Sequence, residues 1–538
     1  MQVDYIVVGA GSAGCIVAEQ LSHNGRHSVL LLEAGGALHN PWISVPAGFG
    51  ATYYHPKYNY MYYSEAEAHM AERNLYVPRG KGLGGSGSIN AMIYVHGAQR
   101  DFDDWAKAGN PDWSYDKVLP YFKQLEEHPS GGTSHRGGQG PIGITPMKDG
   151  AHPTCQHFLT ATKQAGLPQT EDFNGGQFEG AGIYDTNIRD GQRDSSYTAY
   201  LKPALKRINL TLWTQAKVTK LILQGDQVTG SRVTGIEVSH QGQTKQVHAQ
   251  REVILCAGAV ANPQILEWSG IGQQQRLQNA GIDCLLDAPA VGENLQDHLC
   301  ASFYYRAKCS TLNDDFGTLT GKIKAGLQYA FGRKGPLSMS VNQAGGFFRG
   351  SEKEENANIQ MYFNPLSYDI PENPNAKLTP LPYSGFLIAV NPCRPTSRGS
   401  VHINTTNPQQ APEVKFNFLS TEHDRKEVIQ AGNLVRKLAQ AAALQEITVR
   451  EEKPASDVTT DEEMLSYFQQ QGGSIYHLSG TCAMGSDPTT SVVNQELKVH
   501  GLNGLRIVDA SIFPNVTSGN TNAPTMMVAL KAADLILG

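Results

Sequence analysis

The sequence predicts an α/β protein, an α+β arrangement of two domains, in which the first domain is discontinuous along the chain. Residues 3–8 form a short apolar run that leads through a glycine-rich turn and an amphipathic stretch into a second apolar run, 28–32. Alternating patterns from 218 to 254 indicate an antiparallel meander that ends in a buried strand, 253–256, and a strand pattern returns at 505–508. The chain therefore leaves the first domain and later re-enters it.

Length and composition limit the classes of protein to consider. The 538 residues suffice for about two to four folding units. A total of 44 Lys and Arg against 50 Asp and Glu leaves a net charge of −6, which does not favour nucleic acid as a partner. Eight cysteines without a C-x-x-C pair indicate no metal site, and no run approaches the roughly 18 apolar residues of a transmembrane segment. We expect a cytoplasmic protein, and we leave open its oligomeric state and a peripheral contact with the inner face of the membrane.

The turn after the first strand carries a nucleotide-binding pattern. Gly9, Gly11 and Gly14 form a G-x-G-x-x-G sequence between strand and helix, which lets backbone N–H groups approach a pyrophosphate at the helix N-terminus. Glu33 ends the second strand, where an acidic residue accepts hydrogen bonds from a ribose hydroxyl. The pattern predicts a Rossmann-like domain that binds a dinucleotide, and both NAD and FAD satisfy it.

A second glycine-rich element spans residues 79–90, with the sequence RGKGLGGSGSIN. It has too many glycines for a stable helix and enough free N–H groups to form an anion-binding nest. We expect it to lie against phosphate groups or ring edges, and a flexible surface loop is the alternative.

Six segments together resemble the glucose-methanol-choline oxidoreductase family, with the closest likeness to choline dehydrogenase-like alcohol dehydrogenases: 3–22, 78–94, 258–272, 291–298, 474–485 and 505–536. The resemblance spans almost the whole chain. It implies FAD, not NAD, as cofactor. It also implies oxidation of a small-molecule primary alcohol to the aldehyde, with electrons passed to a quinone or another non-oxygen acceptor.

The resemblance also divides the chain between two domains. Residues 1–155, 205–300 and 475–538 are expected to form the FAD-binding domain. Residues 156–204 and 301–474 are expected to form a substrate-binding domain built on an antiparallel sheet with helices.

Cofactor contacts follow from the motifs of the family. They are Gly9, Gly11, Ser12, Ala13, Gly14, Glu33, Ala34, Arg79, Gly84, Gly85, Ser86, Asn90, Ala91, Met92, Val218, Ala257, Gly258, Asp509, Ala510, Asn520, Asn522, Pro524 and Thr525. Members that tether the flavin covalently have a histidine where this chain has Ile89, so we expect non-covalent FAD. The pair Asn262-Pro263 departs from the Ser or Thr that usually precedes this proline.

The resemblance places two catalytic residues near the end of the chain. Removing a hydride from an alcohol carbon requires the O–H proton to be taken or held, and a neutral imidazole suits that task near pH 7. His477 is the expected base and Asn520 the expected orienting group, with Asn522 as a rival if the segment is extended. His96 and His298 have no comparable support, and we interpret them as structural.

The substrate is less well defined by the sequence. Gln343 and Tyr476 are candidate substrate contacts, and Gln343 stands where choline-acting members carry a glutamate, which disfavours choline. Six tyrosines between 53 and 63 either line a substrate entrance or form a packed lid. The alternatives are an oxidase that makes hydrogen peroxide, a hydroxynitrile lyase, and a hydroxy-acid dehydrogenase with Arg394 or Arg398 as the carboxylate clamp.

Overall fold

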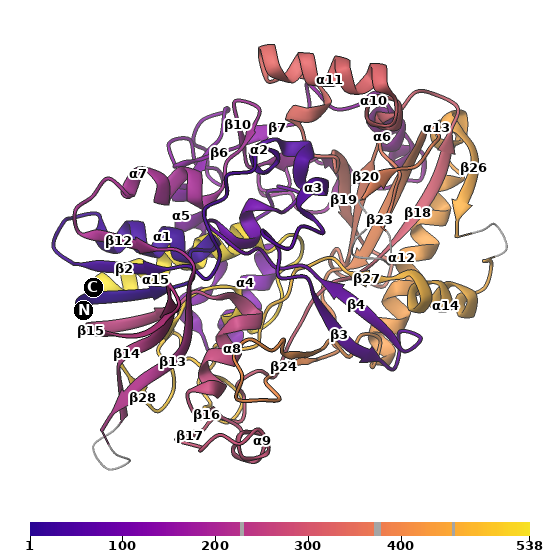
Figure 1. Ribbon diagram of the computed structural model, residues 1–538. Helices are drawn as coiled ribbons and strands as arrows, with labels where there is room; N and C mark the ends of the chain where they lie inside the picture. Colours follow the sequence, from indigo (N-terminus) through magenta and orange to yellow (C-terminus); the bar gives the residue numbers. More distant parts are fainter. Residues whose placement is uncertain (226–230, 371–377, 455–457) are drawn as a thin grey trace.

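The computed structural model describes residues 1–225, 231–370, 378–454 and 458–538, which are organised around two sheets (Figure 1). The first sheet follows the order β12 (Leu210–Trp213), β2 (Val29–Leu32), β1 (Gln2–Val8), β15 (Gln243–Leu255), β14 (Ser231–His240) and β13 (Ala216–Gln224), with β28 (Leu502–Asn503) beside β14 and β29 (Leu505–Ile507) beside β15. β1 runs parallel to β2 and β15, whereas β13, β14 and β15 form an antiparallel meander. The predicted strands, meander and returning strand are confirmed.

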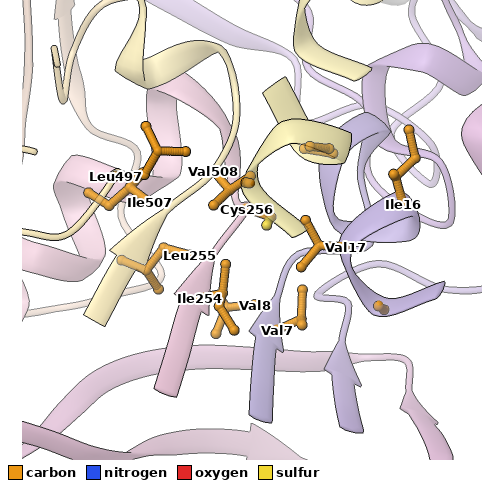
Figure 2. Packing of buried hydrophobic residues seen from close by; sticks show 14 of the residues in the cluster. Val7, Val8, Ile16, Val17, Ile254, Leu255, Cys256, Leu497, Ile507 and Val508 are labelled. Carbon is orange, nitrogen blue, oxygen red and sulfur yellow. The ribbon is translucent and has the colours of Figure 1, made fainter. Parts of the chain in front are cut away.

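The core of this sheet explains why its central strands read as uninterrupted apolar runs. Val7 and Val8 of β1, Ile254 of β15 and Val508 after β29 are at most 4% exposed, and Val17 of α1 (Ser12–Ser22) packs against them (Figure 2). A parallel strand covered on both faces needs apolar residues at every position. Helix α15 (Asn522–Leu537) lies beside α1 and begins two residues before Pro524. A proline within the first turn is tolerated because it removes only an N–H that has no partner within the helix.

The second sheet is antiparallel throughout. Its order is β26 (Thr448–Lys453), β18 (Leu299–Ala307), β23 (Gly385–Pro392), β20 (Ile359–Asn364), β19 (Ala344–Phe348) and β8 (Gly180–Ile183), with β27 (Gly473–Ser474) beside β18. Residues 421–444, whose sequence has a helical pattern, belong to two helices, α12 (Glu422–Ala439) and α13 (Ala442–Ile447), because Ala441 between them has extended backbone. All strands of the two sheets except β18, which starts at Leu299 and crosses the expected boundary at 300, lie within the segments expected for the two domains, and the domain boundaries themselves stay a prediction.

The remaining helices surround and connect the sheets. They are α2 (Pro41–Ser44), α3 (Phe49–Thr52), α4 (Gln99–Lys107), α5 (Tyr115–Leu125), α6 (Thr154–Gln164), α7 (Lys202–Ala204), α8 (Gly258–Trp268), α9 (Gln274–Asn279), α10 (Leu312–Gly317), α11 (Leu319–Gly332) and α14 (Asp461–Gln471). Among the described residues, no helix is long and apolar enough to cross a membrane.

Short strand pairs complete the structure: β3 (Tyr62–Glu67) with β4 (Arg73–Val77), β5 (Glu126–Glu127) with β6 (Ile142–Gly143), β7 (Thr145–Pro146) with β9 (Asp185–Thr186), β10 (Ile188–Arg189) with β11 (Gln192–Arg193), β16 (Ile271–Gly272) with β17 (Leu286–Asp287), β21 (Tyr368–Asp369) with β22 (Thr379–Pro380), and β24 (Ser400–His402) with β25 (Glu413–Lys415). The segment from 38 to 73, which the sequence indicates as an irregular covering loop, therefore contains two short helices and β3.

Gly14 provides a test of the close approach between β1 and α1. A Cβ atom at this position lies 1.8 Å from the carbonyl oxygen of Gly9, which is backbone and cannot move aside. We expect Gly14→Ala to lower the free energy of unfolding by about 1–3 kcal/mol, because overpacking forces the helix away from the strand. Thermal and urea unfolding measure the loss.

Gly326, within α11, is the matched control because nothing lies within 4 Å of its Cβ position. Gly326→Ala should leave stability unchanged or raise it by up to about 1 kcal/mol through helix propensity. Equal stability of wild-type protein and Gly14→Ala would show that the turn tolerates a side chain.

Candidate active site

A cavity of about 1140 Å³ begins at the carboxyl ends of the parallel strands and extends to the second sheet. Val8, Leu32 and Cys256, at the ends of β1, β2 and β15, line its first part. In open α/β sheets ligands bind in this crevice, because the strand ends and the following helix N-termini leave backbone groups free there. The far part of the cavity contains His477 and residues of β18, β20 and β23.

The two glycine-rich elements press against each other at the first part of the cavity. Gly9 has φ +100°, and a Cβ there lies 2.5 Å from the carbonyl oxygen of Cys256. Gly85 has φ +54°, and a Cβ there lies 2.8 Å from the Cα of Gly11. The second element is therefore packed against the first, and side chains at Gly9 and Gly85 would collide with neighbouring backbone. The two glycine-rich turns together form a cradle of the kind that a pyrophosphate requires.

Glu33 lies at the end of β2 with its carboxylate buried beside the cradle. Its Oε2 accepts a hydrogen bond from the Ala10 N–H at 3.0 Å, and its Oε1 accepts one from the Gly35 N–H at 2.7 Å. Burial raises the pKa of this carboxyl group to about 7. Each oxygen keeps a second lone pair, so the carboxylate can also accept from ribose hydroxyls.

Most of the predicted cofactor contacts line this cavity. Those that do are Gly9, Gly11, Ser12, Ala13, Glu33, Ala34, Arg79, Gly85, Ser86, Asn90, Ala91, Met92, Val218, Ala257, Gly258, Asp509, Ala510, Asn520, Asn522 and Thr525. Gly14, Gly84 and Pro524 are not among the lining residues. Gly14 packs against Gly9, the Gly84 N–H donates to the carbonyl of Ala10, and Pro524 is buried in α15.

The side chain of Asp509, one of the lining residues, binds the start of α8. The Asp509 carboxylate accepts from the Gly258 N–H at 2.7 Å and from the amide of Asn262 at 2.8 Å. Asn262, which departs from the family pattern, also accepts from the Ala257 N–H at 3.0 Å. The Asn262 amide thus fills the place of the usual hydroxyl by tying the start of α8 to Asp509.

His477 and Asn520 meet at the far part of the cavity, although they lie on different segments. The amide Nδ2 of Asn520 is 3.2 Å from His477 Nε2, and Asn520 Oδ1 accepts from Gln360 Nε2 at 3.3 Å. Burial, with smaller effects of His298 and Arg79, holds the pKa of His477 well below its usual range. The imidazole is therefore neutral at physiological pH.

His298, which we interpreted from sequence as structural, is in direct contact with His477. Its Nδ1 lies 2.9 Å from His477 Nδ1, and its Nε2 lies 2.8 Å from the carbonyl oxygen of Cys393. Burial lowers the pKa of His298 to about 4, so it is neutral. A carbonyl only accepts, so the single ring proton of His298 is on Nε2 and its Nδ1 accepts.

This arrangement determines the tautomer of His477. Because His298 Nδ1 accepts, His477 Nδ1 must donate, and the lone pair of a neutral His477 is therefore on Nε2. Nε2 is the nitrogen beside Asn520 and the cavity. The segment 291–298 contains His298, but only the fold brings it against His477.

The backbone of His477 is held by buried charged groups. Its N–H donates to Asp297 Oδ1 at 2.7 Å, and Arg79 Nη2 donates to the carbonyl of Tyr476 at 2.5 Å. Tyr476 has φ +74° and its hydroxyl pairs with that of Tyr53. Such strained backbone persists where surrounding contacts over-determine it, and here those contacts fix the position of the imidazole.

Several predictions for the substrate side need correction. Gln343 does not line the cavity: its Oε1 accepts from the His152 N–H at 2.7 Å, and the preceding residue, Asn342, lines the cavity instead. Asn522 does not share the position of Asn520, because it opens α15 and its Oδ1 accepts from Ser12. Arg398 donates to Pro395, Ser397 and Asn515 outside the cavity, and Arg394 does not line it either.

The substrate wall comes from residues that sequence patterns did not single out. Side chains of β18, β20 and β23 face the cavity at alternate positions, as pleated strands require: Cys300, Ser302, Tyr304, Tyr362, Asn364 and Ala389. Five of the six tyrosines between 53 and 63 also line it, and Tyr58 is buried elsewhere.

His96 pairs with Glu126 at 2.7 Å, in agreement with a structural role. Among the described residues no group of three or more His, Cys, Asp and Glu could hold a metal ion.

The cradle, the acceptor pair on Glu33 and the neutral imidazole beyond them fit the class of FAD-dependent oxidoreductases that act on CH–OH donors, and the comparisons with known proteins identify that class. Residues 3–300 and 395–529 match two family models described as GMC oxidoreductase. The chain belongs to the GMC oxidoreductase family, which confirms the resemblance noted in the sequence.

Relatives and solved structures match over nearly the full length. An oxygen-dependent choline dehydrogenase from Photobacterium profundum is 40% identical over 99% of this chain and 93% of its own. The mitochondrial choline dehydrogenase of Homo sapiens is 38% identical over 100% of this chain and 90% of its own. The crystal structure of pyridoxine 4-oxidase from Mesorbium loti superposes with a TM-score of 0.89 at 31% identity, over 99% of this chain and 98% of that one.

Glu33 provides a test of cofactor binding. Both carboxylate oxygens of Glu33 accept from backbone N–H groups, those of Ala10 and Gly35. In Glu33→Gln an NH2 group replaces one of these oxygens, so two hydrogen-bond donors face each other and one hydrogen bond is lost. We expect FAD to bind about 10- to 100-fold more weakly, as measured by titration of apoprotein with FAD. Glu19→Gln, a buried glutamate paired with Arg207, is the control and should leave the affinity unchanged. An unchanged affinity in Glu33→Gln would remove Glu33 from the cofactor site.

Proposed function

We propose that the chain oxidises a primary alcohol to the aldehyde with His477 as the base, and that a quinone or another non-oxygen acceptor then receives the electrons. The observation that carries the proposal is the unprotonated Nε2 of His477, which faces the cavity beside Asn520. FAD supplies, when bound, the acceptor for the hydride at its N5. Ile89 lines the cavity and has no nucleophilic atom, which supports non-covalent FAD.

His477 has the properties of a base for an alcohol proton. Its low pKa keeps it neutral before the substrate arrives, and its Nε2 lone pair faces the cavity. When Nε2 takes the proton, the hydrogen bond from Nδ1–H to His298 keeps the ring in place. An alkoxide donates a hydride far more readily than an alcohol, so moving this proton lowers the barrier.

Asn520 has the properties of an orienting group. Its Oδ1 accepts from Gln360, and its Nδ2 lies within hydrogen-bond distance of His477 Nε2, so an alcohol hydroxyl that donates to Nε2 takes the place of this amide contact. An amide cannot take a proton near neutral pH, so the two residues have separate roles. An alcohol oxygen held by Asn520 lies beside the base.

The alternatives differ in what they predict for the bound flavin and for oxygen. A hydroxy-acid substrate loses its proposed clamp, because neither Arg394 nor Arg398 lines the cavity. A hydroxynitrile lyase would leave the flavin oxidised when it is mixed anaerobically with alcohols. An oxidase would form one hydrogen peroxide per aldehyde in air, whereas our proposal expects far less peroxide than aldehyde when a quinone is present.

His477→Ala tests the base assignment. We expect anaerobic flavin reduction by an alcohol substrate to slow by about 10²–10⁴-fold, because the general base is lost, while FAD remains bound. Stopped-flow absorbance measures the rate, and the flavin spectrum measures occupancy. His423→Ala, a half-exposed histidine on α12, should leave both unchanged. A wild-type rate in His477→Ala would end the assignment.

Because Gln343 does not face the cavity, it gives no reason to disfavour choline as the substrate, and other residues of the cavity wall have to be considered. The second sheet and the β21–β22 pair form one wall of the cavity. Among the described residues of this wall, only Asp369 carries a carboxylate. The Asp369 carboxylate lies 4.0 Å from Lys453 Nζ. Lys453 Nζ also lies 5.5 Å from the ring of Tyr304. On this wall a trimethylammonium group therefore meets tyrosine faces and a single carboxylate, that of Asp369, which is paired with Lys453, and Lys453 repels it.

Two alcohols of the same shape, choline and 3,3-dimethylbutan-1-ol, measure whether the enzyme prefers a cationic or a neutral group on its substrate. In 3,3-dimethylbutan-1-ol a tert-butyl group replaces the trimethylammonium of choline. We expect its kcat/KM to equal or exceed that of choline, because cation–π attraction of about 0.5–2 kcal/mol is opposed by Lys453. A preference for choline of more than about 30-fold would show that the wall recognises the cation.

A further inference from the structure

Helix α11 lies at the periphery of the molecule (Figure 1), and its apolar side chains are exposed to solvent. Leu319, Ile323, Leu327 and Phe331 recur at every fourth position, and they are 75%, 54%, 53% and 88% exposed. Residues four apart lie on one face of a helix, so the four side chains form a continuous strip. Contiguous apolar surface rimmed by polar residues marks an interaction site.

The helix is anchored through the opposite face. At about 100° per residue, Ala325 lies across the helix axis from Ile323 and Leu327, and it is 2% exposed. The hydroxyl of Tyr329, on the same side as Ala325, donates to the carbonyl of Gly191 at 3.1 Å. The anchored side therefore turns the apolar strip outward.

Both ends of α11 are well formed. The Thr318 side chain accepts from the Gly321 N–H at 3.1 Å at the start, and Arg333 closes the helix with φ +49°. Its side chains are thus presented on a capped helix of fourteen residues, with fixed relative positions.

Positive charge borders the strip. Lys322 and Lys324 lie on its two sides, Arg333 and Lys334 follow the helix, and residues 319–334 contain no Asp or Glu. The whole chain carries a net charge of −6, so this basic segment contrasts with the rest of the protein. An apolar face flanked by lysines is typical of helices that lie in a lipid interface.

We propose that α11 seats the enzyme on an anionic lipid surface. Leu319, Ile323, Leu327 and Phe331 enter the boundary between headgroups and acyl chains, and the flanking lysines contact the headgroups. A second copy of the chain fits less well, because a twofold interface over this short helix places the lysines of one copy near those of the other. If the proposed quinone acceptor is correct, this seat also brings the enzyme to a lipid-soluble electron carrier.

The test is sedimentation of holoenzyme with vesicles of phosphatidylcholine alone or mixed 3:1 with phosphatidylglycerol. We expect the wild-type enzyme to bind the anionic vesicles, more weakly at high salt, and to bind the neutral ones at least about tenfold less. The double variant Ile323→Glu, Phe331→Glu should reduce binding to anionic vesicles by at least about tenfold. Oxidation of alcohol with a soluble dye acceptor should stay at the wild-type level, which separates this test from that of the proposed function.

The matched controls are substitutions of exposed apolar residues that lie outside α11. The double variant Ile208→Glu, Val449→Glu replaces side chains that are 104% and 52% exposed, and it should bind vesicles as the wild type does. Lys322→Gln, Lys324→Gln should weaken the preference for anionic over neutral vesicles. Equal binding by the α11 variants and the wild type would overturn the proposal. So would a dimer in light scattering that Phe331→Glu dissociates, because the strip would then be a self-association interface.

Discussion

The hydrogen bond between the Nδ1 atoms of His298 and His477 determines what the site can do. The carbonyl of Cys393 can only accept, so it fixes the proton of His298, and His298 in turn fixes the proton of His477. This relay leaves the Nε2 lone pair in the cavity. Burial supports this arrangement because it lowers the pKa of both imidazoles and so keeps them from being protonated on both nitrogens. A doubly protonated ring could not accept the hydrogen bond that the arrangement requires.

The relay depends on the meeting of two sheets. His298 immediately precedes β18, and Cys393 follows β23, the strand paired with β18. His477 and Asn520 lie on the final segment, which returns to the first sheet through β29 and α15. The glycine cradle proposed for the cofactor lies at the first sheet, so only the packing of the second sheet against this segment brings the proposed base and the proposed cofactor site into one cavity.

Local sequence predicted those features that depend on neighbouring residues. The strand, turn and helix around Gly9 follow from apolar runs and steric limits, and Glu33 follows from its place at the end of a strand. His477 and Asn520 came from family motifs, because nothing in their immediate sequence distinguishes them from other histidines and amides. The structure then added the contact between them and the burial of His477.

The rest required the fold. Which of Asn342 and Gln343 faces the cavity depends on a one-residue register beside β19, and sequence alone does not specify that register. Asn522 lines the cavity but does not stand beside His477 as Asn520 does, because it opens α15 instead of continuing an extended segment. The partner of His477 is 179 residues away, a separation that no local pattern reveals.

The most direct test of this account is the protonation of His477 in the oxidised holoenzyme. Nitrogen NMR of protein labelled at histidine, with the signal assigned by its loss in His477→Asn, distinguishes a protonated ring nitrogen from one with a free lone pair. The account predicts a proton on Nδ1 and a free lone pair on Nε2 at neutral pH. A proton on Nε2 would contradict it, whether His477 is neutral with its single proton there or is protonated on both nitrogens.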